Sequence, residues 1–386
     1  MKRVGVLVVL IALLGTGAYC KPGAGMPPGM PGMMHRIPGF PGNMTPAGHV
    51  PSTMYGFIDR SGKMVIKPNY KWAGDFSEGL AAVQMTSHKW GFIDKSGRMV
   101  IKPKFDRALS FSQGLAAVQV GEKWGYIDKT GKVVIKPKYW FALKFAEDRG
   151  VVCTEQSATG SGDTFSVSYR LGVIDRRGRM VIQPNFKWIE RQYHDGLICG
   201  RMISPGPNGR RVIIDKTGRV VAELNSYDTV EKFVNGLAVV GKGSKWGVIN
   251  TKGKLVIKPI YDRLSIGDNG LITVNIGKKS GYVDTSGRMV IKPRYCEMAF
   301  PFSDGLGLIV IHNKRYYLDK TGKIMITVNN TTDSCTYDES FHEGRAVTVL
   351  HGKYGYIDKT GKMVIKPQFD SAHVFHDGLA VVGIRK

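Results

Sequence analysis

The stretch that decides the fold is KWGFIDKSGRMVIKPKFDRALSFSQGLAAVQV, residues 89–120. The chain then begins the same pattern again with KWGYIDKTGKVVIKPKYW, residues 123–140. A sequence that restarts at a nearly fixed interval is typical of repeat proteins, in which each unit buries its apolar surface against its neighbours. The other copies of the pattern therefore have to be found before any single motif is interpreted.

An Ile-Asp-x-x-Gly pattern, with some variation at the Ile, marks the same point in nine units. Most neighbouring marks are 34 or 35 residues apart, and the longer gaps hold insertions at residues 154–170 and 204–211. We therefore expect one β-repeat domain over residues 53–386. The marking residues are Asp59, Asp94, Asp128, Asp175, Asp215, Asn250, Asp284, Asp319 and Asp358.

Each unit is expected to form three short strands. In the second unit WGFID (residues 90–94) and GRMVI (97–101) are separated by a turn. Asp94 can accept hydrogen bonds from the turn amides, and Gly97 tolerates the positive φ of such a hairpin. Pro103 is expected to end the second strand because it has no ladder donor. GLAAVQV (114–120) supplies the third strand, and a further short strand is expected on the outer side, around residues 105–108.

This order suits an all-β fold of antiparallel three- to four-stranded meanders in a propeller-like ring. The small residues of GLAAV are expected at the innermost position, close to a crowded axis. The last strand (residues 378–386) can complete a sheet with the first (55–59), and such closure removes both exposed edges. An open β-solenoid or superhelix is the alternative. Whether Gly56 lies beside Val382 distinguishes the two.

Aromatic residues recur at two fixed places in the unit. One set precedes Gly and is expected to contribute buried area, because the Gly lets the backbone approach closely. The other set lies three residues before the Gly of the third strand and is expected to fill the space between sheets. The two sets are Trp90, Trp124, Trp246, Tyr55 and Tyr354, and Phe76, Phe111, Phe233, Phe302, Phe341 and Phe375.

The composition is that of a folded, strongly basic protein. Its 386 residues carry 55 Lys and Arg against 31 Asp and Glu, a formal net charge of +24. Such an excess favours anionic partners such as nucleic acid, anionic lipid or acidic polysaccharide. A merely well-solvated basic surface would give the same count.

The N-terminal residues are expected to direct secretion. Residues 1–20 combine Lys2 and Arg3 with a short apolar run, as in a secretory signal peptide. Cys20 also suggests a lipoprotein, although Tyr19 is atypical there. Residues 21–52 are rich in Pro, Gly and Met and are expected to form a flexible, disordered linker.

Four cysteines occupy equivalent places in neighbouring units. Cys153 and Cys199 each lie three residues after the Gly of a third strand, and Cys296 and Cys335 each lie six residues before a Phe. In an oxidising compartment such pairs can bond. The sequence therefore suggests Cys153–Cys199 and Cys296–Cys335 disulfides, with buried free thiols as the alternative.

Two series of basic residues repeat with the unit. Each series is expected to form a line or ring of positive charge that holds an anionic polymer through many weak contacts. The alternative is that Lys at hairpin edges prevents aggregation. The series that follows the turn Gly includes Lys63, Arg98, Lys132, Lys254, Arg288 and Lys362, and the series that precedes Pro comprises Lys67, Lys102, Lys136, Lys258, Lys292 and Lys366.

No established enzyme motif occurs in the chain. It has no Gly-x-Ser-x-Gly, no phosphate-binding loop, no His-Glu-x-x-His and no Cys-x-x-Cys. We therefore expect a non-catalytic protein without a metal or other cofactor. An enzyme site in the divergent units, residues 171–235, is the alternative, with Glu190, His194, Asp195 and Arg201 as its residues.

The repeated elements resemble the WG-repeat family, also called KWG repeats. The resemblance rests on KWGFIDKSGRMVIKP, KWGYIDKTGKVVIKP, KWGVINTKGKLVIKP and KYGYIDKTGKMVIKP and extends over residues 55–386. It implies a secreted or cell-associated bacterial repeat protein and no particular activity. Val212 and Tyr316 replace the Gly of the motif, which predicts distortion in those units.

Taken together, these features predict a secreted or cell-envelope repeat scaffold that binds a partner. The partner is expected to be a protein or an anionic envelope polymer such as an acidic polysaccharide, and a monomer is expected. Nucleic acid is not expected as the natural partner of a secreted protein, and membrane attachment would require a lipid at Cys20. A purely structural surface protein is a further alternative.

Overall fold

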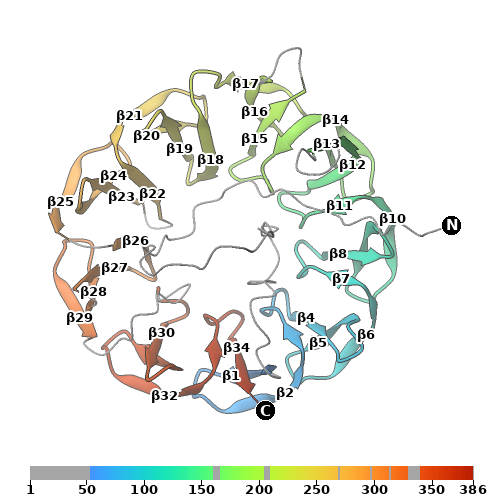
Figure 1. The fold of residues 1–386 in the computed structure, drawn as a ribbon, viewed down its shortest axis with the longest axis horizontal. Coiled ribbons are helices and arrows are strands. Elements are labelled where there is room, and N and C mark those ends of the chain that lie inside the picture. Colours follow the sequence, from blue (N-terminus) through green and yellow to red (C-terminus); the bar gives the residue numbers. More distant parts are fainter. Residues whose placement is uncertain are drawn as a thin grey trace, which may run out of the picture.

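The computed structural model describes residues 53–159, 166–203, 209–267, 270–295, 298–312, 314–328 and 340–385. These residues form antiparallel sheets arranged around one axis (Figure 1). Within these ranges no helix is long and apolar enough to cross a membrane. The predicted signal peptide, the linker and Cys20 lie outside the described residues.

The ring consists of nine blades, numbered here along the chain from the Asp59 unit to the Asp358 unit. Blades 1, 2, 3, 6, 7 and 8 are four-stranded sheets. Blades 4 and 5 share one seven-stranded sheet, because β14 is the outer strand of blade 4 and its end is the inner strand of blade 5. Blade 9 shows three strands among the described residues.

The strands of a blade are arranged radially, from the axis outward, as β18 to β21 show in Figure 1. The inner strands are β33 (Ser371–Ala372), β3 (Trp72–Ala73), β7 (Arg107–Ala108), β11 (Phe141–Ala142), β18 (Thr229–Val234), β22 (Arg263–Ile266) and β26 (Met298–Ser303). The second strands are β34 (Leu379–Arg385), β4 (Leu80–Gln84), β8 (Leu115–Val120), β12 (Gly150–Thr159), β15 (Leu197–Met202), β19 (Leu237–Lys242), β23 (Leu271–Ile276), β27 (Leu306–Ile311) and β30 (Arg345–Leu350).

The third strands carry the WG motif, and the outer strands follow the turn. The third strands are β1 (Thr53–Asp59), β5 (Trp90–Asp94), β9 (Lys123–Asp128), β13 (Ser166–Ile174), β16 (Arg211–Asp215), β20 (Lys245–Asn250), β24 (Lys279–Asp284), β28 (Lys314–Leu318) and β31 (Lys353–Asp358). The outer strands are β2 (Met64–Tyr70), β6 (Met99–Phe105), β10 (Val133–Tyr139), β14 (Met180–Ile189), β17 (Val220–Glu223), β21 (Leu255–Tyr261), β25 (Met289–Tyr295), β29 (Ile324–Val328) and β32 (Met363–Phe369).

The two ends of the repeat region meet in blade 1. Strands β1 and β34 pair antiparallel from Thr53 opposite Arg385 to Asp59 opposite Leu379. Gly56 lies directly opposite Val382 in this register. The predicted ring is therefore confirmed, and the open superhelix is wrong.

The predicted order of strands within a blade was wrong in one respect. The short strand near residues 105–108 is β7, and it pairs with β8 on the axis side, with Ala108 opposite Val118. The GLAAV strand is therefore second from the axis. The reason is that β9 already occupies the other edge of β8, so only the inner edge has backbone groups left to satisfy.

The Asp-x-x-Gly turns form as predicted. In blade 2, Asp94 Oδ1 accepts hydrogen bonds from Ser96 N, Ser96 Oγ and Arg98 N at 3.0, 2.6 and 3.1 Å. Gly97 has a φ of 84°, which a residue with a side chain rarely adopts. These hydrogen bonds, with that of Ser96 Oγ the strongest, lower the pKa of Asp94 to about 2 despite some desolvation.

The Gly of the WG motif lies against the backbone of the outer strand. A Cβ added at Gly91 would lie 2.5 Å from the carbonyl oxygen of Ile101 and 2.9 Å from the nitrogen of Pro103. The sheet register shifts at this point, because Trp90 is opposite Phe105 whereas Phe92 is opposite Ile101. The Gly and the Ile-Lys-Pro segment are thus two halves of one bulge.

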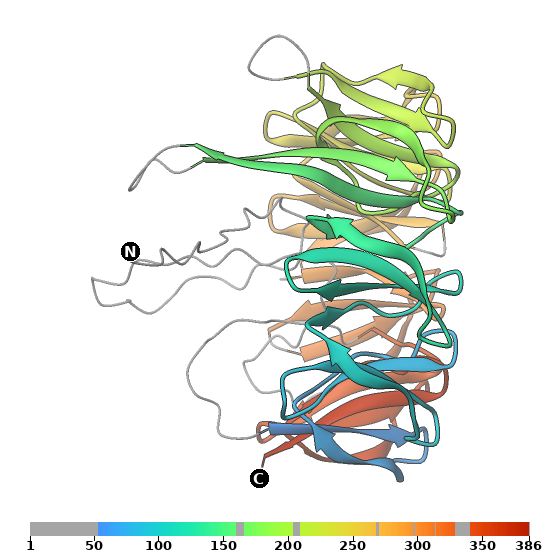
Figure 2. The ribbon, with the colours of Figure 1, turned by 90° about the vertical axis from the view of Figure 1, so that its right-hand side faces the viewer.

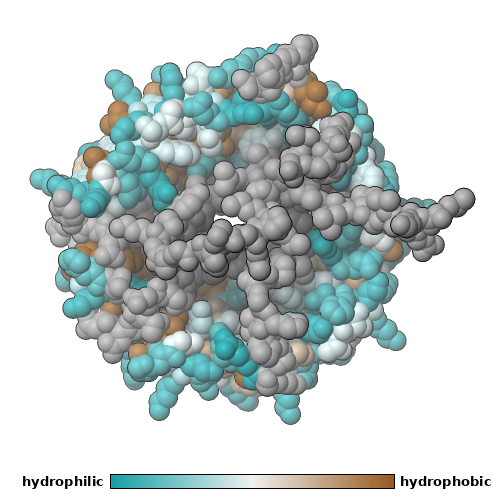
Figure 3. All heavy atoms as spheres, viewed as in Figure 1, coloured by the Kyte–Doolittle hydropathy of each residue, from teal (hydrophilic) through white to brown (hydrophobic). Residues whose placement is uncertain are grey.

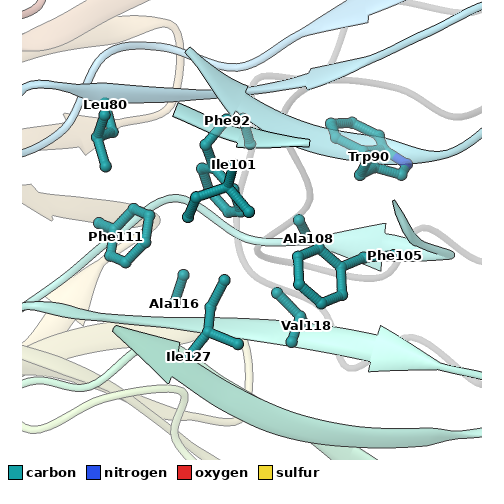
Figure 4. Close-up of a cluster of buried hydrophobic side chains, with 11 residues drawn as sticks. Leu80, Trp90, Phe92, Ile101, Phe105, Ala108, Phe111, Ala116, Val118 and Ile127 are labelled. Atoms are coloured by element: carbon teal, nitrogen blue, oxygen red, sulfur yellow. The ribbon is translucent and has the colours of Figure 1, made fainter. Parts of the chain in front are cut away.

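The hydrophobic core consists of nine clusters, one at each junction between neighbouring blades. Figure 4 shows the junction of blades 2 and 3, where Phe92 and Ile101 of one blade meet Phe111, Ala116 and Ile127 of the next. No blade is stable alone on this plan, because each buries its two faces against its neighbours.

The predicted packing of the Phe set between the sheets is confirmed, whereas in the set before the motif Gly only Trp90 and Trp124 are buried and the other three are partly buried. Phe111 is fully buried, and its ring meets that of Phe92 from the preceding blade at 4.8 Å. Phe76 meets Phe57 at 4.9 Å in the same manner. Equivalent contacts occur at four further junctions: Tyr126–Phe145, Tyr282–Phe302, Tyr317–Phe341 and Tyr356–Phe375.

One hairpin departs from the ring. Strands β12 and β13 pair from Gly150 opposite Ile174 to Thr159 opposite Ser166, well beyond the length of the other hairpins. Figure 2 shows this hairpin projecting from one face of the ring. It contains the described part of the first insertion.

We predict that Gly91→Ala destabilises the fold by about 1–3 kcal/mol, because the new methyl group meets main-chain atoms that cannot rotate away. Denaturant unfolding followed by tryptophan fluorescence measures the change. Gly121→Ala is the control. Gly121 has a φ of 61° but open space around its Cα, so only the backbone cost of about 1 kcal/mol applies. A larger effect at Gly121 than at Gly91 would contradict this explanation.

We also predict that acid destabilises the ring through its turns. The pKa values of Asp94, Asp215 and Asp284 are each lowered from 3.8 to about 2 in the fold, chiefly by hydrogen bonds from Ser or Thr hydroxyls. Because the folded pKa lies below the unfolded pKa, this stabilisation is complete above about pH 4 and is lost as the pH falls towards 2. Thermal unfolding at a series of pH values measures the loss.

The matched variant is the triple change of these three residues to Asn. Asn250 shows that an amide serves the turn, because its Oδ1 accepts hydrogen bonds from Lys252 N and Lys254 N, both at 3.0 Å. The triple variant should therefore fold at pH 7 and lose part of the drop in melting temperature between pH 4 and 2. An unchanged acid profile would show that other groups control acid unfolding.

Candidate binding surface on the outer wall

The outer strands alternate between the core and the outside of the ring. In β6, Ile101 and Phe105 are buried, whereas Val100, Lys102 and Lys104 are exposed, as is Arg98 directly before the strand. Successive side chains of a strand point to opposite faces, so these four residues form one outward column. Arg98 and Lys102 are four residues apart, which corresponds to about 13 Å along the strand.

Both predicted basic series therefore lie on one surface, which we call the outer wall. The six lysines that precede Pro are all exposed, as are the basic residues that follow the turn Gly. Figure 3 shows hydrophilic side chains around much of the rim, with hydrophobic patches between them. The lysines of this pre-Pro row are Lys67, Lys102, Lys136, Lys258, Lys292 and Lys366.

The two rows differ in how much free charge they offer. The arginines after the turn Gly fold back on the Asp of their own turn, as Arg98 Nε does at 3.0 Å from Asp94 Oδ2. Arg179, Arg219 and Arg288 make the same ion pair. In the part of the chain that the structure describes, no ion pair involves a lysine of the pre-Pro row. This row therefore carries the larger share of the uncompensated charge.

Ring closure makes part of this row continuous. Lys366 of blade 9 and Lys67 of blade 1 are 299 positions apart in the sequence, but their blades are neighbours in the ring because β34 completes blade 1. Blades 9, 1, 2 and 3 each carry a pre-Pro lysine. We call Lys366, Lys67, Lys102 and Lys136 the basic arc.

The other blades interrupt the row. Gln183 replaces the lysine in blade 4, Glu223 lies at the end of the short outer strand of blade 5, and Thr327 takes the place in blade 8. Blades 6 and 7 keep Lys258 and Lys292. The pre-Pro row therefore consists of a run over four blades and a run over two, separated by blades 4 and 5 and by blade 8.

An exposed apolar residue separates the two basic positions in three of the four columns of the arc, whereas Val364 of blade 9 is partly buried. Val65, Val100 and Val134 are 40%, 38% and 43% exposed. Val290 in blade 7 is 38% exposed. A ligand on this surface would thus meet cations and apolar contact area side by side.

Many other lysines are used to hold the blades together, which the sequence did not reveal. The Lys of KWG binds the Asp at the entrance to the following blade, and the Asp also accepts an N–H from that blade, as Asp106 does from Gly121 at 2.7 Å. In blade 4 Trp140 takes the place of this Asp, and Lys123 Nζ lies 3.2 Å from the centre of its ring. The ion pairs are Lys89–Asp106, Lys245–Asp262 and Lys353–Asp370, at 2.5, 2.6 and 2.8 Å.

A second set of contacts between blades lies beside the Asp-x-x-Gly turns. Glu78 of blade 2 accepts the N–H of Gly114 of blade 3 at 2.9 Å, and Lys129 of blade 3 lies 3.3 Å from the same carboxylate. Burial opposes ionisation there, but these two partners outweigh it and hold the pKa of Glu78 below its ordinary value. Asp377 of blade 1 likewise accepts the N–H of Gly79 of blade 2, and so links the two ends of the repeat region.

The predicted Cys153–Cys199 disulfide was wrong. Both cysteines are free and buried. Cys153 packs at the junction of blades 4 and 5, whereas Cys199 packs at the junction of blades 5 and 6. In the register of their blades the two positions differ by two residues, because Cys153 is opposite Leu171 and Cys199 is opposite Ile213. Residues two apart in a strand share a face, so both thiols point to the following blade and a whole sheet separates them. Packed sheets lie about 10 Å apart, beyond the reach of a disulfide. Cys296 and Cys335 lie outside the described residues.

The residues suggested for an enzyme site in the divergent units are not assembled into one cleft. His194 and Asp195 lie just before β15, whereas Arg201 lies near its other end, opposite Arg211. Asp195 accepts the N–H of Gly236 at 2.7 Å, so it serves the contact between blades 5 and 6. Burial raises the pKa of Glu190 to about 8, against the charge of Lys232.

The repeat unit of this ring matches a known protein family. A model of the WG-containing repeat matches eight segments of the chain. The chain belongs to this family. The matched segments are residues 55–86, 90–124, 124–156, 172–199, 213–246, 246–279, 281–314 and 354–385.

The interval between the last two WG repeats, residues 315–353, is not matched and contains the Asp319 unit. There Tyr316 replaces the Gly of the motif, and β29 has no Pro. The register of β28 and β29 is correspondingly regular from Arg315 to Tyr317, without the bulge seen elsewhere. The unit keeps its turn and its place in the ring but has lost the residues that define a WG repeat.

Solved structures similar to this WG-repeat protein are distant. The crystal structure of the computationally designed Ika8 protein is 11% identical, with 81% of this chain and 95% of that chain covered and a TM-score of 0.42. BamB from Moraxella catarrhalis is 15% identical over 66% and 80%, with a TM-score of 0.35. AztD from Citrobacter koseri is 11% identical over 72% and 95%, with a TM-score of 0.38. A search of curated proteins finds no match.

We predict that Cys153 and Cys199 do not react with a water-soluble thiol reagent in the native protein. Burial raises the pKa of Cys153 to about 12 and that of Cys199 well above its ordinary value, so thiolate is scarce at neutral pH. Labelling followed by mass spectrometry, with and without denaturant, measures the reactivity of each thiol. A Cys153–Cys199 link in non-reducing peptide maps would contradict the structure.

Proposed function

We propose that this WG-repeat protein is a non-catalytic scaffold that holds an anionic polymer of the cell envelope against its outer wall. The observation that carries the proposal is the basic arc of blades 9, 1, 2 and 3. Its four lysines are exposed, and ring closure makes their blades neighbours. An acidic polysaccharide is the polymer class that we favour.

The repeated surface supports a polymer rather than a small molecule. One exposed ion pair contributes only about 0.2–1 kcal/mol. Several such contacts to one chain add through a high effective concentration, provided that the ligand spans them. A ligand with many evenly spaced charges satisfies that condition, whereas a single small anion does not.

The expected secretion supports the choice of ligand. The basic, apolar and small residues of residues 1–20 favour export, and acidic polysaccharides are available outside the cell. On this proposal the protein acts as a monomer in the periplasm or on the cell surface. A lipid on Cys20 would attach it to a membrane.

We predict that changing Lys67, Lys102, Lys136 and Lys366 together to Gln weakens binding to polygalacturonate about 10- to 100-fold at low salt, because four weak contacts are lost. Isothermal titration calorimetry at several salt concentrations measures the affinity. The wild-type affinity should also fall steeply as salt is raised.

The matched control changes four exposed lysines outside the arc, Lys242, Lys252, Lys278 and Lys320, to Gln. Both variants have the same net charge, so a control effect under about threefold assigns binding to the arc rather than to total charge. Equal loss in both variants, or affinity independent of salt, would contradict the proposal. Tight binding of an acidic protein but not of the polysaccharide would point to a protein partner instead.

A further inference from the structure

A shallow surface cavity of about 370 Å³, open to solvent, lies at the junction of blades 3 and 4, where the basic arc ends. Lys138 and Tyr139 at the end of β10 line one side, and Thr154, Gly178 and Met180 of blade 4 line the other. Lys138 is the last member of the outward column that contains Lys132, Val134 and Lys136. The cavity size is within the range of sites that hold a small molecule or one unit of a polymer.

Blade 4 is irregular where it lines the cavity. The register of β12 and β13 shifts between Cys153 and Glu155, so Thr154 is the extra residue of a β-bulge. A bulge turns a side chain away from the regular alternation of the strand. In blade 3 the corresponding strand β8 pairs with β9 without a shift, and Val120 occupies the equivalent place.

The lining combines a cation, a hydroxyl group and apolar surface. Lys138 Nζ is exposed and lies 5.2 Å from the centre of the Tyr139 ring, which orients the ammonium group beside the cavity. Thr154 Oγ1 donates to the carbonyl oxygen of Arg170 at 3.2 Å, which leaves its lone pairs able to accept a hydrogen bond. Met180 adds an adaptable apolar contact.

We infer that this cavity is a subsite for one acidic sugar residue of the polymer. A sugar acid offers the three matching features: a carboxylate for Lys138, a hydroxyl donor for Thr154, and an apolar ring face for Met180. This inference rests on the proposed function, because it gives the polymer on the basic arc a chemically specific position. The arc supplies affinity for charge, and the subsite distinguishes a sugar acid from other polyanions.

The test compares two probes of equal charge, a galacturonate oligomer and a glutamate oligomer of the same length, by isothermal titration calorimetry. Wild-type protein should prefer the galacturonate oligomer. Lys138→Gln should weaken that oligomer about fivefold, the effect of one favourable ion pair, and should reduce the preference. Thr154→Phe, which fills the cavity, should abolish the preference while leaving the glutamate affinity within about twofold, because the arc is untouched.

The matched controls lie in the neighbouring blades. Lys104 occupies the same strand position in blade 2, with its Nζ 5.3 Å from the ring of Phe105, and Lys104→Gln should weaken both probes equally. Val120→Phe is the control for Thr154→Phe. Equal effects of the Lys138 and Lys104 variants on both probes, or no effect of Thr154→Phe, would overturn the subsite and leave the arc standing. If the four-lysine arc variant binds both probes like wild type, the proposed function itself fails.

Discussion

The contact that shapes seven of the nine blades is that between the Gly of the WG motif and the backbone of the outer strand at its Ile-Lys-Pro segment, or Ile-Gln-Pro in blade 4. Where the Gly is present, a carbonyl oxygen and a Pro nitrogen occupy the space that a Cβ would need. Where Val212 or Tyr316 replaces it, the following outer strand has no Pro and pairs with one register shift fewer. The Gly and the Pro are thus present or absent together within one chain. The steric contact explains why the two residues occur together, although they are about a dozen positions apart in the sequence.

The same bulge determines how the outer strand meets the solvent. The Ile faces the next blade, where it contacts the turn Gly, as Ile101 does with Gly131. The residues on either side of that Ile must then point outward, and in the arc these are a Val and a Lys. The charge of +24 is therefore not spread at random. Some basic residues make ion pairs between blades, and some arginines pair with the carboxylates of their own turns. Others, including the pre-Pro lysines, lie exposed on the outer wall.

Much of this architecture was predictable because it repeats. Nine units, their turns, the aromatic contacts between blades and the pairing of Gly56 with Val382 all follow from local patterns plus the cost of free sheet edges. One error was local to the unit: Pro103 was expected to end the second strand, but β6 continues through the bulge to Phe105. The other errors arose where the arrangement of units matters more than the unit. Cys153 and Cys199 look equivalent in sequence, but Cys153 is opposite Leu171, before the motif Gly, whereas Cys199 is opposite Ile213, after the place of that Gly. Both side chains face the following blade, so a sheet separates them. Likewise, the sequence alone does not distinguish two kinds of lysine. The lysine of KWG binds a neighbouring blade, whereas the lysine before Pro faces outward.

The irregular blades make the outer wall differ from one blade to the next. A ring of nine identical units would offer a polymer nine equivalent positions, and the bound chain could slide around the wall without preference. Here blades 4, 5 and 8 lack the pre-Pro lysine, and the bulged residue Thr154 lines a cavity at one end of the arc. The divergence of the central units therefore need not reflect relaxed constraint alone. On the proposed function, the gaps at blades 4, 5 and 8 and the cavity beside blade 4 together convert a uniform basic wall into a run of lysines with a defined start and end.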